Sequence, residues 1–201
     1  FQIIRGDTLR DPAFFDGDKM ARFDCVLANP PFSLENWGSK QWEQDAHGRN
    51  RYGTPPDSNG DYAWVQHMIR SMSSYNGRMA VVLPHGVLFR KGKEDVIRKK
   101  IIKDDILEAV IGLPPNIFYG AALAPAILVF KAKKDLTDQV IFVDASDQVQ
   151  VGRAQNFLHK GHVDQIYQWY VNKEPVDSHV ALVSVSEIAE NNYSLNIPLY
   201  V

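Results

Sequence analysis

The stretch FDCVLANPPF, residues 23–32, decides the fold class of this chain. Its first six residues are mostly apolar, and a short continuous run of this kind is typical of a strand that is buried on both faces of a largely parallel sheet. Similar runs recur farther along the chain, at residues 79–83, 106–113, 126–130 and 140–143. Because segments with a helical period lie between these runs, the sequence predicts an α/β fold with a mainly parallel sheet.

Helical periodicity separates the apolar runs. In residues 61–75 apolar side chains recur three or four positions apart, and Asp61 is expected to cap this helix at its start. Residues 93–103 form a shorter candidate helix with a basic outer face. The basic stretch from Arg90 to Lys103 could touch phosphates, but the interleaved and flanking acidic residues favour a solvated face. Another helix is expected around residues 163–170, and the Ser184–Glu187 segment has the spacing of a capping box.

The composition is that of an ordinary soluble domain. The 201 residues are 45% apolar and carry a formal net charge of -2, so any DNA contact must come from a local basic face or from a partner. The single cysteine, Cys25, is expected to be a core thiol, and no metal site is expected. The longest apolar stretch, residues 120–130, is too short for a membrane span, and no signal peptide is visible. We therefore expect a cytoplasmic protein without membrane contacts.

The chemistry is expected in Asn29-Pro30-Pro31-Phe32, directly after the first apolar run. In open α/β sheets ligands bind beyond the carboxyl ends of the strands, which is where this turn would lie. The exocyclic amine of adenine is a poor nucleophile because its lone pair is delocalised into the ring. The side-chain oxygen of Asn29 and the backbone carbonyl of Pro30 would accept its two N–H bonds, and the prolines would hold both acceptors in place. Phe32 would stack on a base that is flipped out of the double helix.

The same four residues could also form only a stiff turn that closes a strand, since Asn-Pro is a common turn signal. The segment that follows, residues 34–60, is rich in Gly, Asn, Trp and Arg, and a loop of this length is usually functional or disordered. It combines positive charge with aromatic rings, which is typical of contacts with DNA. The candidates for such contacts are Lys40, Arg49, Arg51, Trp37 and Trp42.

Asn-Pro-Pro-Phe is the catalytic motif of the amino-methyltransferases, and the chain resembles the modification subunit of type I restriction–modification systems, which are N6-adenine DNA methyltransferases. The further segments that carry the resemblance, in order along the chain, are GDTL (6–9), GDYA (60–63), LPHGVLFR (83–90), GLPPNIFYG (112–120) and NIPLY (196–200). The resemblance implies a class I S-adenosylmethionine-dependent methyltransferase with a Rossmann-like sheet, of which this chain is the half that follows the third strand. It also implies a cofactor, S-adenosyl-L-methionine, a flipped adenine in double-stranded DNA as the substrate, and a specificity subunit and a restriction subunit as partners.

Individual roles follow from the resemblance. It implies that Asn29–Phe32 is the catalytic motif, that Asp7 accepts a hydrogen bond from the adenine of the cofactor, and that Phe118 places a second aromatic ring near the flipped base. The alternatives are an Asx-type turn at Asp7 and simple packing of the loop by Phe118. His85 also follows a buried strand, but the chemistry does not need it, and a histidine with satisfied hydrogen bonds is expected there.

The sequence departs from the family in its cofactor site. Class I methyltransferases hold S-adenosylmethionine with a glycine-rich turn after the first strand, and no Gly-x-Gly occurs in these 201 residues. The resemblance places that turn before Phe1, so the chain by itself is expected to be inactive and to bind the cofactor weakly. Residues 1–4 would be a strand without neighbours unless the absent strands fill the gap. Residues 121–125 also depart, because related subunits more often carry a Gly and a Thr there.

We expect residues 1–160 to be the C-terminal half of a catalytic domain, and residues 161–201 to be a helical and extended segment that packs on it or on a partner. RNA guanine-N2 and protein glutamine methyltransferases are alternatives, since both use closely related Asn-Pro-Pro-aromatic motifs. The segments at 84–90 and 196–200 argue against these two enzymes. In a further, non-catalytic interpretation the chain is only an assembly or DNA-docking module.

Overall fold

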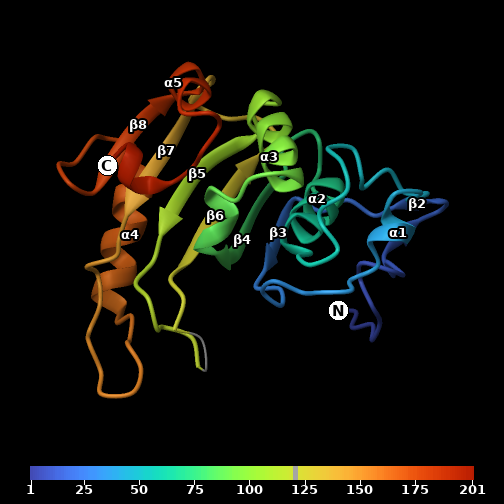
Figure 1. Ribbon diagram of the computed structural model, residues 1–201, viewed down its shortest axis with the longest axis horizontal. Coiled ribbons are helices and arrows are strands. Elements are labelled where there is room, and N and C mark those ends of the chain that lie inside the picture. Colours follow the sequence, from blue (N-terminus) through green and yellow to red (C-terminus); the bar gives the residue numbers. More distant parts are fainter. Residues whose placement is uncertain (120–121) are drawn as a thin grey trace.

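The computed structural model describes residues 1–119 and 122–201. Its centre is a six-stranded sheet in the order β3–β4–β6–β5–β7–β8, and β1 and β2 form a small hairpin outside that sheet (Figure 1). The strands are β1 (Phe15–Asp16), β2 (Lys19–Met20), β3 (Cys25–Ala28), β4 (Arg78–Pro84), β5 (Leu107–Gly112), β6 (Pro125–Lys131), β7 (Gln139–Asp144) and β8 (Val180–Ser184). The helices are α1 (Ser39–Trp42), α2 (Asp61–Ser71), η1 (His85–Leu88), α3 (Lys93–Lys103), α4 (Lys160–Asn172), α5 (Val185–Glu190) and η2 (Ile197–Leu199).

Strands β3, β4, β5 and β7 run in one direction. β3 pairs in parallel with β4, and β5 pairs in parallel with β7, while β6 is antiparallel to both β4 and β5. The last strand, β8, is antiparallel to β7. The carboxyl ends of β3, β4 and β5 therefore lie along one edge of the sheet (Figure 1). The predicted α/β fold with mainly parallel strands is confirmed, and Asn29 follows directly on the carboxyl end of β3.

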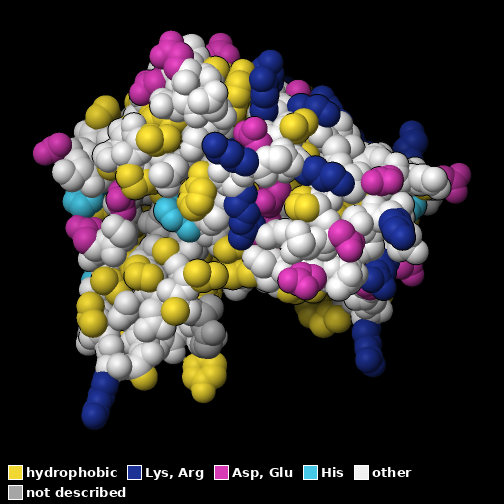
Figure 2. Space-filling view, in the orientation of Figure 1, with side chains coloured by type: hydrophobic (Ala, Val, Ile, Leu, Met, Phe, Trp, Pro, Cys, Tyr) yellow, Lys and Arg dark blue, Asp and Glu magenta, His cyan; other side chains and the backbone are white. Residues whose placement is uncertain are grey.

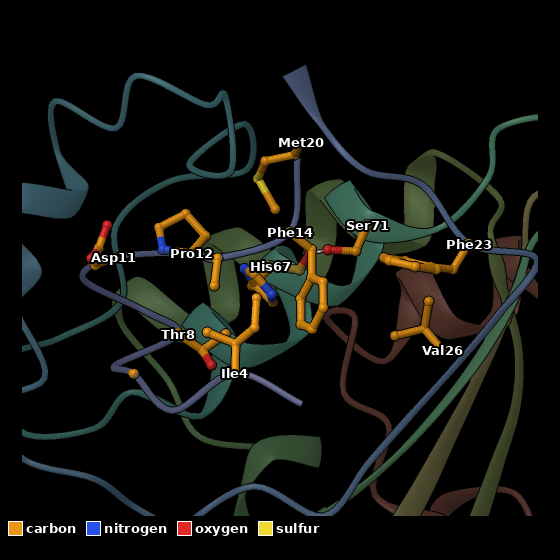
Figure 3. Close-up of a pocket in the computed structure, with 12 residues that line it drawn as sticks. Ile4, Thr8, Asp11, Pro12, Phe14, Met20, Phe23, Val26, His67 and Ser71 are labelled. Carbon is orange, nitrogen blue, oxygen red and sulfur yellow. Dashed lines mark hydrogen bonds between the residues drawn. The ribbon is translucent and has the colours of Figure 1, made fainter. Parts of the chain in front are cut away.

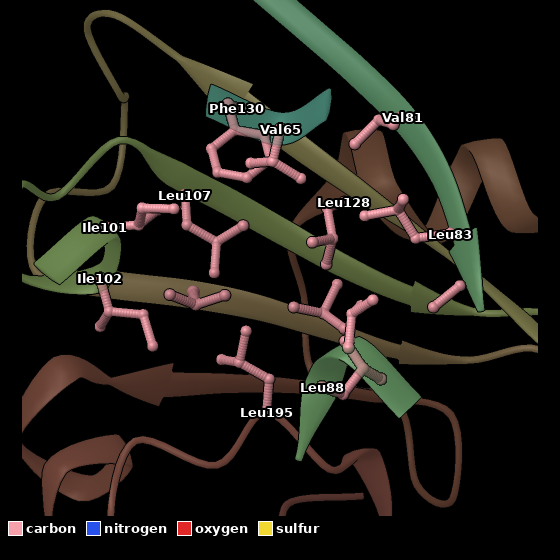
Figure 4. Packing of buried hydrophobic residues seen from close by; sticks show 14 of the residues in the cluster. Val65, Val81, Leu83, Leu88, Ile101, Ile102, Leu107, Leu128, Phe130 and Leu195 are labelled. Carbon is pink, nitrogen blue, oxygen red and sulfur yellow. The ribbon is translucent and has the colours of Figure 1, made fainter. Parts of the chain in front are cut away.

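Helices cover both faces of the sheet. Phe142 of β7 belongs to a large apolar cluster with α2, α3 and α5, whereas its neighbour Ile141 belongs to a second cluster with Ile166 and Trp169 of α4. Because successive residues of a strand point to opposite faces, the two clusters lie on opposite sides of the sheet. Figure 4 shows the larger cluster, in which the central strands pack against helices and against Leu195. The result is a three-layer arrangement of helix, sheet and helix.

Strand β3 is the outermost strand on one side of the sheet, and only one of its faces is buried, contrary to the prediction that both are. It pairs only with β4, and Cys25 and Leu27 are exposed, the latter at 72%. Val26 and Ala28, on the other face, pack against the larger cluster. The expectation of a core thiol at Cys25 is therefore wrong, because the described residues cover only one face of this strand. In β5, by contrast, all residues are buried.

The predicted strand at residues 1–4 does not form. These residues are exposed and have no regular secondary structure. A single strand leaves its backbone N–H and C=O groups without partners, so it needs a neighbour, and none of the strands described here pairs with this segment. Gly120, the last residue of the GLPPNIFYG segment, and Ala121, the first residue of the departure at 121–125, lie outside the described residues.

The helix predicted at 61–75 ends earlier, at Ser71. The Phe23 N–H donates to the Ser71 carbonyl over 2.8 Å, and the Ser73 N–H donates to the Phe23 carbonyl over 2.9 Å, so the chain leaves the helix to pair beside β3. The helix predicted at 93–103 is confirmed as α3. Part of the predicted capping box is also present, because Ser184 Oγ accepts a hydrogen bond from the backbone N–H of Glu187.

The C-terminal residues contribute to the same sheet and core. Strand β8 pairs with β7, and Ile188, Leu195 and Ile197 belong to the larger apolar cluster. The division of the chain at residue 160 stays a prediction. No helix in the described part of the chain has both the length and the apolar character that crossing a membrane requires.

His67 makes the stability of this fold depend on pH. Burial in α2 lowers the pKa of His67 to about 4, and the Arg49 guanidinium acts in the same direction. The unfolded chain, whose histidine pKa is near 6.5, therefore binds the proton more readily, and the free energy of unfolding falls as the pH drops below about 7. We expect His67→Gln to reduce this loss between pH 7 and pH 5 by about 1–2 kcal/mol. Urea unfolding at both pH values measures it, and parallel losses in parent and variant would contradict a buried neutral ring.

Candidate active site at the carboxyl ends of β3 and β4

The Asn29–Phe32 segment forms the turn that leaves β3. Pro30 is buried, Phe32 is half-buried and Asn29 is exposed. The parallel ladder with β4 ends where Ala28 pairs with Val81, so the turn begins where the neighbouring strand stops holding the backbone. Figure 2 shows that the molecule is hollowed along the edge where β3 and β4 end in Figure 1. The amide of Asn29 is thus accessible from solvent at this edge.

A buried carboxylate binds the residue that follows the turn. Ser33 has a left-handed backbone conformation, with a φ of 51°, and its N–H donates to Oδ1 of Asp61 over 2.7 Å. Asp61 is completely buried, and its Oδ2 atom forms an ion pair with Arg90 over 2.9 Å. The expectation that Asp61 caps α2 is wrong, because the N-cap is Gly60 and the carboxylate is bound by Ser33 and Arg90 instead.

Phe32 and Phe118 form an aromatic pair beside the turn. Their ring centroids are 6.0 Å apart and the ring planes meet at 84°, which is an edge-to-face arrangement. Phe118 lies in the loop after β5, so the fold brings together the two aromatic residues that the sequence predicts near a flipped base. The same geometry also fits simple packing of the two loops, and the base-binding role of Phe118 stays a prediction.

Asp7 shapes a local turn. Its Oδ1 atom accepts hydrogen bonds from the backbone N–H groups of Leu9 and Arg10, over 3.2 and 3.1 Å. Its Oδ2 atom lies 3.7 Å from Nε of Arg10, and both side chains are exposed. The Asx-type turn is therefore present, and it leaves one carboxylate oxygen accessible to a ligand. The contact of Asp7 with the cofactor stays a prediction.

The long loop at residues 34–60 is folded around a buried arginine. Arg49 forms an ion pair with Asp45 over 2.6 Å, and its guanidinium also donates to the backbone carbonyls of Thr8 and Leu9. The guanidinium carbon lies 4.7 Å from the centre of the Trp42 ring. These contacts tie the loop to the N-terminal segment and satisfy the charge of Arg49 inside the protein.

Three of the five residues proposed for DNA contacts are thus unavailable. Arg49, Trp37 and Trp42 are only 4%, 3% and 2% exposed, so their expected role at the surface is wrong. Both tryptophans are needed to cover the start of α2, and Arg49 is needed to pair the buried Asp45. Lys40 and Arg51 are exposed, and Arg51 forms an ion pair with Asp104 over 2.7 Å.

The basic stretch from Arg90 through α3 is only partly solvated. Arg98 is 3% exposed and donates to the backbone carbonyls of Val87, Arg90 and Tyr193. The prediction of a solvated face is therefore wrong for Arg90 and Arg98, because carbonyls and carboxylates inside the protein take up their donors. Other Lys and Arg side chains do gather at the surface over α3 (Figure 2), and the ammonium groups of Lys99 and Lys103 lie over the Tyr193 ring.

His85 follows β4 at the same edge of the sheet as Asn29. Its Nε2 atom is buried and has no hydrogen-bond partner among the described residues, so the expected satisfied histidine is not observed. The ring packs edge-to-face against Phe89, with centroids 6.1 Å apart. Burial lowers the pKa of His85, although the charge of Asp144 acts against this shift.

A cavity of about 200 Å³ lies beside β3 rather than beyond its carboxyl end (Figure 3). Its wall is mostly apolar and includes Ile4, Phe14, Phe23 and Val26, with His67 on the side of α2. None of the residues predicted for the site lines this cavity. Within the described ranges, no group of three or more His, Cys, Asp or Glu side chains is arranged to hold a metal ion.

The interaction that sequence analysis missed is the ion pair between Asp61 and Arg90. Asp61 lies in GDYA and Arg90 in LPHGVLFR, two segments that carry the family resemblance. The resemblance therefore marks each residue as a candidate for the site. The sequence does not show that they meet, because the whole of β4 lies between them. Their shared partner, Ser33, directly follows the Asn29–Phe32 turn.

All of residues 1–201 match the family model for N-6 DNA methylases. The chain is similar to the type I restriction enzyme MjaVII methylase subunit of Methanocaldococcus jannaschii, with 31% identity over 212 residues, covering 100% of this chain and 36% of that protein. It is 30% identical over 207 residues to the type I restriction enzyme MpnII methylase subunit of Mycoplasma pneumoniae, covering 100% of this chain and 38% of that protein. The chain therefore spans less than half the length of these curated relatives.

A solved structure has the same fold. It is the crystal structure of the type I restriction-modification system methyltransferase subunit from Streptococcus thermophilus, with a TM-score of 0.87 and 37% identity. The similarity covers 97% of this chain and 41% of that chain. The class I S-adenosylmethionine-dependent methyltransferase fold that the family resemblance implies is thus confirmed.

The buried position of Arg49 leads to a prediction about stability. Arg49→Met leaves the Asp45 carboxylate buried without its partner, so we expect the free energy of unfolding to fall by about 3–5 kcal/mol. Arg51→Met is the matched control, because that side chain is 68% exposed and its ion pair should contribute about 1 kcal/mol or less. Denaturant unfolding of both variants measures the difference. Equal small losses would mean that Arg49 does not hold the loop.

Proposed function

The chain belongs to the N-6 DNA methylase family, and we propose on this basis that the protein containing it transfers a methyl group from S-adenosyl-L-methionine to the N6 amine of adenine in double-stranded DNA. The observation that carries the proposal is the Asn29–Phe32 turn, which follows the carboxyl end of β3 and exposes its asparagine. The names of the two curated relatives, methylase subunits of type I restriction enzymes, favour this activity over methylation of RNA guanine or protein glutamine.

The proposed role of the turn is to stabilise the amine as it becomes positively charged. The Asn29 side-chain oxygen and the Pro30 carbonyl would accept the two N–H bonds, and neither Pro30 nor Pro31 has an N–H that could compete for them. When bound, S-adenosyl-L-methionine would supply the methyl group from its sulfonium, so that the new carbon–nitrogen bond to N6 replaces the carbon–sulfur bond. The amine then loses one proton, which can pass to solvent because Asn29 is exposed.

The residues of this chain fit one end of the cofactor. The accessible Oδ2 atom of Asp7 would accept a hydrogen bond from the amino group of the cofactor's adenine, while Oδ1 maintains the turn. The sequence contains no Gly-x-Gly turn of the kind that holds the ribose and the methionine. We therefore assign only the adenine contact to this chain.

The aromatic pair would receive the flipped base. Phe32 extends from the same turn as Asn29, and Phe118 reaches it from the loop after β5, so a base near Asn29 would find an aromatic face beside it. We further propose that the protein works in the cytoplasm with a specificity subunit and a restriction subunit. This rests on the relatives, which are named as subunits of type I restriction enzymes.

Asn29→Ala tests the proposed chemistry in the full-length enzyme. Removing one of two acceptors that strengthen in the transition state should slow methyl transfer on the order of a hundredfold or more. Cofactor and DNA affinities should change much less. The measurement is single-turnover methylation of an adenine-containing duplex, with Asn76→Ala in the exposed turn before β4 as the control. A near-parental rate in Asn29→Ala would show that Asn29–Phe32 is only a turn.

Phe32→Ala should behave differently from Asn29→Ala. Loss of the stacking face should weaken DNA binding by about 1–3 kcal/mol and also slow methyl transfer. Phe15→Ala is the matched control, because Phe15 is 42% exposed and lies in the small β1–β2 hairpin, outside the proposed site. DNA affinity and single-turnover rates distinguish the variants, and an unchanged affinity in Phe32→Ala would exclude the stacking role.

A further inference from the structure

The Asp61 carboxylate connects three segments at the end of the Asn29–Phe32 turn. One oxygen accepts the Ser33 N–H at 2.7 Å, and the other accepts from Arg90 at 2.9 Å. The Asp61 backbone N–H is itself bound by Asn59 Oδ1, over 3.0 Å, which holds the start of α2. Asp61 has no solvent exposure, so its geometry is set by these partners and not by water.

The backbone conformation of Ser33 is unfavourable, and its hydrogen bond with Asp61 stabilises it. A left-handed conformation at a residue other than glycine costs about 1–2 kcal/mol, and a charge-assisted hydrogen bond can offset that cost. The turn is held at its start by the β3–β4 ladder, which ends at Ala28. The Ser33 N–H bond holds it at its end. Asn29 and Pro30 lie between these two points, so their acceptor oxygens depend on both.

Arg90 supplies the positive charge that pairs with the Asp61 carboxylate. A Cβ atom at Gly86 would lie 2.7 Å from Arg90 Nε, so the glycine gives the guanidinium room to pass. Nη1 of Arg90 also lies 3.4 Å from Oε1 of Glu94. Burial raises the pKa of Glu94, and the positive charge of Arg90 offsets only part of this increase. The shorter contact, with Asp61, is therefore the principal ion pair.

We propose that Asp61 is a positioning residue for methyl transfer, which acts by fixing the backbone at Ser33 and with it the acceptors of Asn29 and Pro30. The inference rests on the proposed function of the turn. Asp61 does not touch the substrate. Its loss would let the turn relax, and misplacement of reacting groups by about 1 Å can cost a hundredfold in rate.

A purely structural ion pair provides the comparison. Glu108, 3% exposed, forms an ion pair with Lys131 over 2.8 Å near the amino end of β5, at the opposite edge of the sheet from the turn. Asp61→Asn and Glu108→Gln make the same chemical change, from a buried carboxylate to an amide. If Asp61 only stabilised the fold, both variants would lower activity in proportion to the unfolded fraction.

The test measures single-turnover methylation per folded molecule in the full-length enzyme, together with cofactor and DNA affinities. We expect Asp61→Asn to slow methyl transfer about tenfold to a hundredfold with affinities within about threefold of the parent, and Glu108→Gln to keep the parental rate. Equal rates in these two variants would overturn the proposal. Should Asp61→Asn fail to fold, Arg90→Gln, at a partly exposed position, should show the same slowing to a smaller extent.

The Asn29→Ala variant separates this proposal from the proposed function. A slow Asn29→Ala with a parental Asp61→Asn would reject the positioning role and leave the function of the turn intact. A parental Asn29→Ala would reject the proposed function itself. In that case any slowing in Asp61→Asn would have to come from another part of the enzyme.

Discussion

The parallel pairing of β3 with β4 is the constraint on which the site depends. Two adjacent parallel strands cannot be joined by a tight turn, so the chain must cross back to the other edge of the sheet before the second strand begins. Helix α2 makes this crossing. Its first residue, Asp61, therefore lies at the same edge as the turn after β3, and its last residue, Ser71, lies beside Phe23 at the opposite edge.

Charged and aromatic side chains hold the largely irregular segment between β3 and α2 in place. The segment that leads into α2 packs Trp37 so closely on Gly60 that a Cβ atom there would lie 2.9 Å from the indole. Arg49 ties the same segment to the N-terminal residues, and Arg90 reaches the first turn of α2 from the end of η1. Arg49 pairs with the Asp45 carboxylate and Arg90 with the Asp61 carboxylate, and such pairing is the condition under which charges are tolerated in a protein interior. The polar groups around the turn are thereby held in place.

The helices and strands could largely be predicted from the sequence, but which elements pack beside each of them could not. The apolar runs became strands and residues 93–103 became α3, because periodicity and propensity are local properties. Cys25 was expected in the core, but its exposure depends on which strand or helix lies beside β3, and sheet order is not a local property. Arg49 and Trp42 were expected on the surface for a related reason, since the same pair of side chains serves DNA binding or a buried cation–π contact.

The sequence by itself determined the Asn-Pro-Pro-Phe turn at the end of a strand, because both the strand and the proline-stiffened turn arise from adjacent residues. The resemblance carried by the other segments pointed to the family. Only the tertiary structure decided that Phe118 lies against Phe32, and that Asp61 binds both Ser33 and Arg90. These contacts join segments that are separated by whole strands and helices. Their distances are therefore set by the order of strands in the sheet and by the path of α2, which no local pattern of residues specifies.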